Sequence, residues 1–289
     1  DIAGYQPDVL VLVDYPGFNL RIAEFAKSLG IKVVYYISPQ LWAWKEGRVE
    51  KIKNFVDEML VILPFEKEFY KKHRVDAHFV GHPLLDAISD LPEISAEDFK
   101  KEHGLNEKEI IALLPGSREQ EVEKMLALML SVRPFFKNYQ FVIAGAPSLT
   151  KEFYSKFVDD DVHFVSNKTY DLLRCSRAAL VTSGTATLET ALLNIPEVVC
   201  YRSSRISYEI GKRVVKNIKF ISLVNLIMDR EVVTELIQKE LNTENLVKEL
   251  QHILDVEKRE KMLQNFELLR EKLGGKGASD HAAEIIVKS

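Results

Sequence analysis

The sequence contains little cysteine, no excess of positive charge and no long apolar run. Its two cysteines, Cys175 and Cys200, are too few for a disulfide framework and fit a reducing, cytoplasmic setting. The formal net charge is −4, from 39 basic and 43 acidic residues, so composition gives no support for a general nucleic-acid role. No apolar run reaches the roughly 18 residues of a membrane-spanning helix. The seven histidines show no metal-ligand spacing, so we expect no metal site.

What the sequence does contain is a regular alternation of short apolar runs and amphipathic segments along its 289 residues. This alternation is typical of an α/β protein with parallel sheets and helices on both faces. The length suffices for one large or two ordinary domains. Residues after about 223 are predicted to be almost entirely helical. The predicted strands are 9–13, 32–37, 57–62, 77–80, 110–114, 140–144, 162–165, 178–181 and 197–200.

Glycine and proline indicate where the domains divide. The segment 81–95 contains a glycine and two prolines before a helix cap, so we interpret it as a junction. We predict an N-terminal α/β domain at 1–88 and a C-terminal α/β domain at 89–273. A last helix within 274–289 follows a glycine linker and is a candidate to return to the first domain.

The most informative motif is IIALLPGSREQEVEKM, at 110–125. Its apolar run predicts a buried parallel strand that ends at a Pro-Gly turn, after which a helix pattern begins. We predict that Ser117 caps this helix and that two acids, Glu119 and Glu121, lie in its first turn. A turn of this kind directs backbone N–H groups at one spot, which suits phosphate. Arg118 lies beside that spot, and its guanidinium can bind phosphate oxygens in a bidentate manner.

A second motif, LVTSGTATLETALLNIP at 180–196, repeats the order of strand, small-residue turn and helix. Ser183, Gly184 and Thr185 offer N–H and hydroxyl donors at a helix N-terminus. Glu189 follows about one helical turn later, where a carboxylate can accept hydrogen bonds from ribose hydroxyls. Ordinary tight turns are the alternative for either motif alone. Together, at the carboxyl ends of strands in one sheet, the two motifs predict a nucleotide site.

Several further candidates stand outside these motifs. Asp14 follows a strand and precedes a Pro-Gly turn, which suits a general base, with a turn residue as the alternative. Asn225 lies among apolar residues and needs hydrogen-bond partners, either from a ligand or from a turn. His82 follows a strand end, as a site residue or a structural histidine. The basic stretch 203–220 carries aromatic residues and suits an anionic membrane surface or a phosphorylated substrate, with a solvated helix face as the alternative.

Seven segments, taken in order, resemble those of the lipid-A-disaccharide synthases, a family of bacterial glycosyltransferases. They are PDVLVLVDYPGFNLRIA, YYISPQLWAWKEGRVEKI, LPFEKEFY, FVGHPLLDAI, LLPGSREQEVE, TSGTATLETALLNIPEVVCYR and SLVNLI. The resemblance covers nearly the whole chain, and SPQLWAW is its most specific part. It implies the GT-B architecture of two facing Rossmann-like domains, with an acceptor-side domain first and a UDP-sugar-binding domain second.

The resemblance also implies a reaction in lipid A and lipopolysaccharide biosynthesis. UDP-2,3-diacylglucosamine would donate its sugar to 2,3-diacylglucosamine 1-phosphate (lipid X), giving the β-1,6-linked disaccharide 1-phosphate and UDP in one inverting displacement. No metal and no other cofactor is implied, so cationic side chains and helix N-termini would offset the charge of the leaving diphosphate. The implied partners are the two acylated sugars and the inner-membrane surface, without nucleic acid, and a homodimer is one implied assembly. The implied location is cytoplasmic, peripheral on the inner face of the inner membrane of a Gram-negative bacterium.

Position by position, the resemblance assigns roles to individual residues. Asp14 matches the acid expected to act as base, Arg118 matches the arginine expected at the diphosphate, and Asn225 matches a functionally important asparagine. His82 matches a histidine at the inter-domain junction. The residues implied to bind the UDP part are Ser117, Arg118, Ser183, Gly184, Thr185, Glu189 and Arg202.

The sequence departs from the family pattern at its beginning. Family members start with a βα unit that carries a glycine-rich motif, which this sequence does not contain, so we expect roughly 60–90 residues of the first domain to be missing from it. Two alternatives to the synthase interpretation therefore remain. One is another GT-B enzyme that acts on a UDP-sugar, such as an N-acetylglucosaminyltransferase or an epimerase, and the other is a UDP-binding fragment without turnover.

Overall fold

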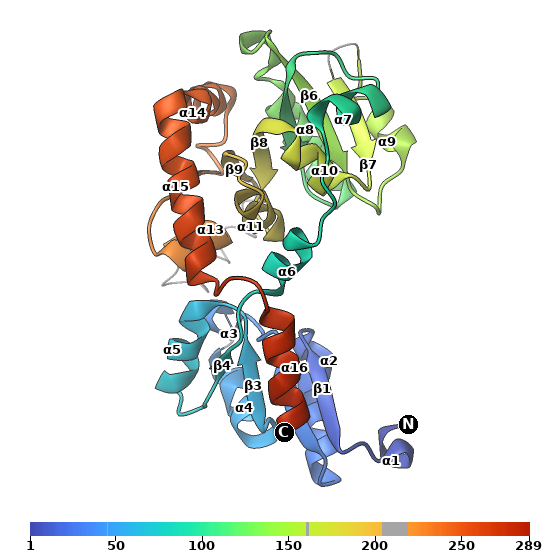
Figure 1. Cartoon of the computed structure of the whole chain (residues 1–289), viewed down its shortest axis with the longest axis vertical. Helices are drawn as coiled ribbons and strands as arrows, with labels where there is room; N and C mark the ends of the chain where they lie inside the picture. The colour runs from blue at the N-terminus through green and yellow to red at the C-terminus, as the bar shows by residue number, and fades with distance from the viewer. Residues whose placement is uncertain (45, 160–161, 204–218) are drawn as a thin grey trace. The chain divides into compact units, whose positions relative to one another are not determined.

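The structure is a computed structural model that describes every residue of the chain except 45, 160–161 and 204–218. Its described residues form two compact units (Figure 1). Unit 1 comprises 1–90 and 270–289, and unit 2 comprises 91–203 and 219–269. Each unit is built on its own parallel sheet, as predicted for an α/β protein. Within the described part of the chain, no helix combines the length and the apolar character needed to cross a membrane.

Unit 1 contains a four-stranded sheet in the order β1-β2-β3-β4. Its strands are β1 (Val9–Val13), β2 (Lys32–Tyr36), β3 (Glu58–Val61) and β4 (His78–Phe79). Its helices are α1 (Ile2–Tyr5), α2 (Pro16–Ser28), α3 (Leu41–Trp44), the short 3-10 helix η1 (Glu46–Arg48), α4 (Val49–Phe55), α5 (Pro64–Lys72), α6 (Pro83–Ser89) and α16 (Ala278–Lys288).

The two faces of the unit 1 sheet bury alternate residues of β2, as the two-residue period of a strand requires. Val33 and Tyr35 pack on one face together with α2, α4 and α5. Val34 packs on the other face with Leu60 and with Ala282 of α16. The C-terminal helix therefore covers the second face of this sheet, and Figure 1 shows it in red beside β3.

The start of α16 is fixed to α6 by one carboxylate. Asp86 accepts hydrogen bonds from the backbone N–H groups of Gly277 at 2.6 Å and Ser279 at 2.9 Å. Gly81 lets the chain pass closely, because a Cβ atom there would lie 3.2 Å from Cβ of Ala278 and because its φ of +92° favours glycine. These contacts fix the position of α16 within unit 1.

Unit 2 contains a six-stranded sheet in the order β10-β9-β8-β5-β6-β7. Its strands are β5 (Glu109–Leu114), β6 (Tyr139–Gly145), β7 (Val162–Ser166), β8 (Ser176–Thr182), β9 (Glu197–Tyr201) and β10 (Thr234–Ile237). Its helices are α7 (Ala96–Glu102), α8 (Glu119–Leu130), the 3-10 helix η2 (Arg133–Phe135), α9 (Lys151–Ser155), α10 (Thr169–Arg174), α11 (Thr185–Leu192), α13 (Leu223–Met228), α14 (Thr243–Leu254) and α15 (Val256–Lys272), whose last residues, from 270 on, belong to unit 1.

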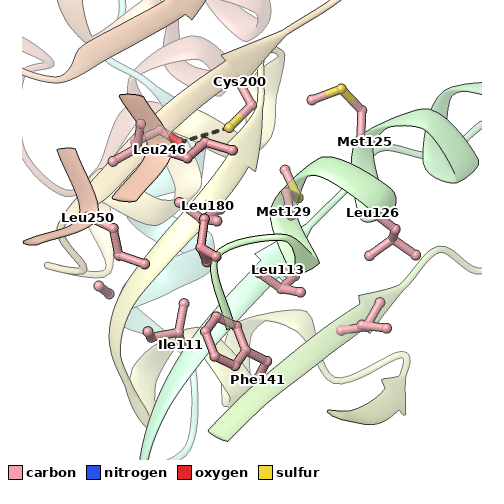
Figure 2. Packing of buried hydrophobic residues seen from close by; sticks show 14 of the residues in the cluster. Ile111, Leu113, Met125, Leu126, Met129, Phe141, Leu180, Cys200, Leu246 and Leu250 are labelled. Atoms are coloured by element: carbon pink, nitrogen blue, oxygen red, sulfur yellow. Dashed lines mark hydrogen bonds between the residues drawn. The ribbon is translucent and has the colours of Figure 1, made fainter. Parts of the chain in front are cut away.

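The unit 2 sheet is buried on both faces. Figure 2 shows one face, where Leu113 of β5 and Leu180 of β8 pack with Met129 of α8 and Leu250 of α14. The opposite face packs against α7 and α10, with Phe99 among its fully buried side chains. Because helices cover both faces, it is the ends of the strands that carry the turns available to a ligand.

All the strands predicted from the sequence are present, with ends that shift by one or two residues. The prediction that residues after about 223 are almost entirely helical was wrong, because β10 pairs in parallel with β9. This strand is short and contains the acid Glu235, so it lacks the apolar run from which the other strands were recognised.

Candidate nucleotide site and family membership

The two small-residue turns lie next to each other at the carboxyl edge of the unit 2 sheet. Strands β5 and β8 are hydrogen-bonded parallel neighbours, and Leu114 pairs in register with Val181 near their ends. Because both strands run in the same direction, the turns that follow them emerge side by side, one leading into α8 and the other into α11. The prediction that both motifs occupy one edge of one sheet is confirmed.

The first turn depends on its glycine and is one residue longer than predicted. Gly116 has a φ of +108°, and a Cβ atom there would lie 2.8 Å from Oε2 of Glu121. The N-cap of α8 is Arg118, in an extended conformation, so the prediction that Ser117 caps this helix was wrong. Ser117 remains in the turn, where its carbonyl accepts a hydrogen bond of 2.9 Å from the hydroxyl of Ser148.

Arg118 presents an exposed guanidinium beside the N-terminus of α8. It caps the helix with its backbone only, and within the described part of the chain its side chain has no hydrogen-bond or ion-pair partner. Glu119 and Glu121 lie in the first turn of α8, as predicted. The positive end of a twelve-residue helix and a free guanidinium together make an electropositive spot.

The second turn presents an open helix N-terminus. Gly184 is the N-cap of α11, and a Cβ atom there would meet no heavy atom within 4 Å. Thr185 is exposed, and its amide donates to no acceptor among the described residues. The hydroxyl of Ser183 donates a long 3.4 Å hydrogen bond to the carbonyl of Ile221, which links this turn to the segment before α13.

Glu189 is half-buried one helical turn beyond these residues and has a partner that sequence reasoning missed. The hydroxyl of Tyr170, on α10, donates a 2.9 Å hydrogen bond to its Oε1. Burial and the nearby Glu189 charge raise the pKa of Tyr170, so the phenol keeps the proton that it donates. Oε2 receives no hydrogen bond from any described residue. No pattern around Tyr170 could have revealed this pair, since the two residues lie on separate helices.

Asn225 lies fully buried in α13 and uses its whole amide within the protein. Its Nδ2 donates to the carbonyl of Val233 at 2.8 Å and to Oε1 of Glu235 at 2.9 Å. Its Oδ1 accepts from the amides of Val232 at 2.7 Å and Val233 at 3.0 Å. These four bonds fill the two donor and two acceptor positions of an asparagine amide. Glu235 also accepts from both the amide and the hydroxyl of Ser222, the N-cap of α13.

Two other sequence candidates are held by protein groups. A terminal nitrogen of Arg202 donates to the carbonyl of Gln238 at 3.1 Å and to that of Leu241. In unit 1, His82 caps α6 by accepting a hydrogen bond of 3.2 Å from the amide of Leu84. Burial lowers the pKa of His82 to about 4, so its ring is neutral near pH 7. Of the basic stretch 203–220, the part from 204 to 218 lies outside the described residues.

Asp14 lies in unit 1 directly after β1. Its carboxylate is exposed and has no hydrogen-bond or ion-pair partner among the residues that the structure covers. Its backbone amide and carbonyl, in contrast, take part in three hydrogen bonds. A free carboxylate on a fixed backbone has the form that a general base requires.

The unit 2 groups can hold a doubly charged anion and a neighbouring diol. Two helix N-termini and Arg118 supply positive potential and N–H donors, and Glu189 supplies an acceptor one helical turn away. The described residues contain no group of three or more His, Cys, Asp or Glu that would hold a metal ion.

Two units, each with a parallel sheet covered by helices, are typical of the GT-B class of proteins. Comparison with solved structures agrees with this fold. The UDP-GlcNAc 2-epimerase of Neisseria meningitidis bound to UDP-GlcNAc matches with a TM-score of 0.67 and 16% identity, over 100% of this chain and 78% of the other. The UDP-GlcNAc 2-epimerase of Methanocaldococcus jannaschii in complex with UDP-GlcNAc and UDP matches with a TM-score of 0.59 and 12% identity, over 93% and 77%. At these identities the likeness concerns the fold alone.

The family follows from sequence comparison. The family model described as lipid-A-disaccharide synthetase matches residues 1–288. The lipid-A-disaccharide synthase of Syntrophus aciditrophicus is 43% identical over 288 residues, which are 96% of this chain and 74% of the relative. That of Myxococcus xanthus is 40% identical over 295 residues, 98% and 76% of the two chains. The chain belongs to the lipid-A-disaccharide synthase family, and its function is that of a glycosyltransferase of lipid A biosynthesis.

Proposed function

We propose that the chain transfers 2,3-diacylglucosamine from UDP to lipid X, and that unit 2 binds the UDP part of the donor. The observation that carries this proposal is the pairing of β5 with β8, which brings two helix N-termini to one edge of the sheet. Arg118 and Glu189 flank that edge with the cation and the acceptor that a nucleoside diphosphate requires.

The proposed donor site uses each of these groups for one part of UDP. Arg118 and the backbone donors near Ser117 bind the diphosphate, and so do the turn residues Ser183, Gly184 and Thr185. Glu189 accepts hydrogen bonds from the ribose. As the bond between the anomeric carbon and the diphosphate oxygen breaks, negative charge grows on UDP. Fixed donors and a cation stabilise that charge more in the transition state than in the ground state.

The proposed base is Asp14. It takes the proton from the 6-hydroxyl of lipid X while that oxygen bonds to the anomeric carbon of the donor, and UDP leaves from the opposite side. One displacement of this kind inverts an α-linked donor into a β-linked product. The exposure of the carboxylate supports this role, because a general base must come within hydrogen-bonding reach of the hydroxyl whose proton it takes.

Asn225 and Arg202 are proposed to stabilise segments of unit 2 rather than to contact the substrate. The amide of Asn225 has no hydrogen-bonding position left for a substrate, so we assign it to holding α13 beside the turn at Ser183. Arg202 fastens the chain after β9 to the chain after β10 in the same way.

The acyl chains of both proposed substrates lie in a membrane, so we propose that the chain works at the inner-membrane surface. A transfer assay tests the function as a whole, with lipid X as acceptor and the acylated UDP-sugar or unacylated UDP-GlcNAc as donor. We expect the disaccharide 1-phosphate from the acylated donor only. Efficient turnover of UDP-GlcNAc with no preference for acyl chains would contradict the proposal.

A further inference from the structure

The backbone at Asp14 has an uncommon conformation for residues with side chains. Asp14 has a φ of 46° and Tyr15 a φ of 44°, so two successive non-glycine residues lie in the left-handed region. For a residue with a Cβ atom this region costs roughly 1–2 kcal/mol. Such a conformation persists only where surrounding contacts determine it.

Three hydrogen bonds hold the peptide groups of Asp14. Its amide donates to the carbonyl of Tyr36 at 3.1 Å, which extends the pairing of β1 with β2. Its carbonyl accepts from the hydroxyl of Tyr35 at 2.6 Å and from Nδ2 of Asn19 at 2.7 Å. Its amide and carbonyl are therefore fixed, while its carboxylate has no partner among the described residues.

Tyr35 reaches Asp14 from the interior of the unit. It lies on β2 with 0% of its surface exposed, so its hydroxyl has no access to bulk water. Burying a hydroxyl without a partner is unfavourable, and the Asp14 carbonyl supplies that partner. Burial and the nearby charge of Asp14 raise the pKa of Tyr35, so the hydroxyl remains a donor.

Asn19, in the first turn of α2, supports the same backbone conformation. Its side chain is 9% exposed, and its Nδ2 donates to the carbonyl of Val13 at 2.9 Å as well as to that of Asp14. One amide group thus holds the last residue of β1 and the residue that follows it. Tyr35 and Asn19 come from different elements and meet at one carbonyl oxygen.

We propose that Tyr35 and Asn19 are positioning residues that hold the Asp14 carboxylate in the orientation needed for proton transfer. This inference rests on the proposed role of Asp14 as base. Misplacing a reacting group by about 1 Å can lower a rate by about 100-fold without changing substrate binding. Loss of either donor therefore lowers kcat and leaves the KM for the UDP-sugar unchanged.

The test measures kcat and KM in the transfer assay for Tyr35→Phe, Asn19→Ala and Asp14→Asn, and for each positioning change combined with Asp14→Asn. We expect Tyr35→Phe and Asn19→Ala each to lower kcat about 10- to 100-fold with the donor KM within about twofold. In the Asp14→Asn background, neither change lowers the residual rate further, because the group that they orient is already lost.

Tyr70→Phe is the matched control. Tyr70 is also fully buried in unit 1, but its hydroxyl pairs with that of Ser38 at 2.8 Å rather than with Asp14. Its kcat should stay within about twofold of the unaltered chain. If Tyr35→Phe fails to fold, Asn19→Ala still tests the proposal, because the two changes remove different donors from the same carbonyl.

The outcomes separate the inference from the proposal on which it rests. Full activity of Asp14→Asn overturns the base assignment and this inference with it. An inactive Asp14→Asn together with normal kcat in Tyr35→Phe and Asn19→Ala overturns the positioning role alone. Losses that persist at the same size in the Asp14→Asn background also overturn it, since they indicate a general structural effect.

Discussion

Leu114 and Val181 are register partners at the ends of neighbouring parallel strands, and their pairing brings together two helix N-termini that are far apart in the sequence. Neither turn alone distinguishes a ligand site from an ordinary βα connection. Their adjacency is what favours the proposed ligand site, because two helix dipoles and one guanidinium converge on a small region.

The clearest single change at this site is Arg118→Ala. A hydrogen bond to a charged group contributes roughly 1.5–3 kcal/mol, so UDP affinity should fall about 10- to 100-fold. Isothermal titration calorimetry with UDP measures this directly. Lys124→Ala removes an exposed charge further along the same helix and should leave the affinity unchanged. If Arg118→Ala and Lys124→Ala weakened UDP binding equally, Arg118 would contribute only through its positive charge and not through a direct contact.

Tyr170→Phe tests the support of Glu189. Loss of the hydroxyl removes one hydrogen bond, worth about 0.5–1.5 kcal/mol, and leaves the carboxylate less well oriented. We expect UDP to bind about 3- to 10-fold more weakly and its 2′-deoxy analogue to be less affected, because the analogue lacks one ribose hydroxyl. Tyr139→Phe, at the opposite end of a strand in the same sheet, is the control. If UDP and its 2′-deoxy analogue lost affinity to the same extent, Tyr170 would have no role in ribose recognition.

Asn225→Ala tests whether that residue acts by holding α13. Its removal leaves the buried amides of Val232 and Val233 without their acceptor, at a cost of about 1–3 kcal/mol each. Hydrogen exchange at these two amides should become at least tenfold faster. A variant that keeps slow exchange at both positions but loses activity would indicate direct contact between Asn225 and substrate instead.

Glu66 predicts a pH dependence of the stability of unit 1. It is buried, it accepts hydrogen bonds from the amide of Leu63 at 3.0 Å and from Nε1 of Trp42 at 3.3 Å, and burial raises its pKa to about 7. The folded state therefore retains a proton that the unfolded state releases near pH 4.5. The free energy of unfolding should fall as pH rises from about 4.5 to about 7 and then level off, by up to about 3 kcal/mol.

Urea unfolding followed by tryptophan fluorescence reports on this unit, because Trp42 and Trp44 are the only tryptophans of the chain and both belong to it. Glu66→Gln should lose this slope between pH 4.5 and 7, whatever its absolute stability. An unchanged slope in that variant would assign the pH dependence to another group.

The sequence predicted the strands of both sheets and the position of both turns, because these depend on local patterns. Apolar runs such as Ile110 to Leu114 are recognisable without tertiary information. Strand β10 was missed because Glu235 interrupts its apolar character, and what stabilises that acid is its partner set of Ser222 and Asn225. Such a set exists only after folding.

For the same reason, sequence patterns could not predict which residues of distant elements contact each other. Tyr170 meets Glu189, and Tyr35 meets Asp14, through the strand order and the packing of helices on a sheet. The helix start at Arg118 was misjudged by one residue, because a Ser in a turn resembles an N-cap whether or not the turn continues past it.

The most direct test of the account is a crystal structure of the chain with UDP. We predict the diphosphate at the edge shared by β5 and β8, within hydrogen-bonding distance of the amide of Thr185 and the guanidinium of Arg118, with the ribose hydroxyls on Glu189. A UDP molecule bound elsewhere, or one whose phosphates contact neither turn, would contradict the account.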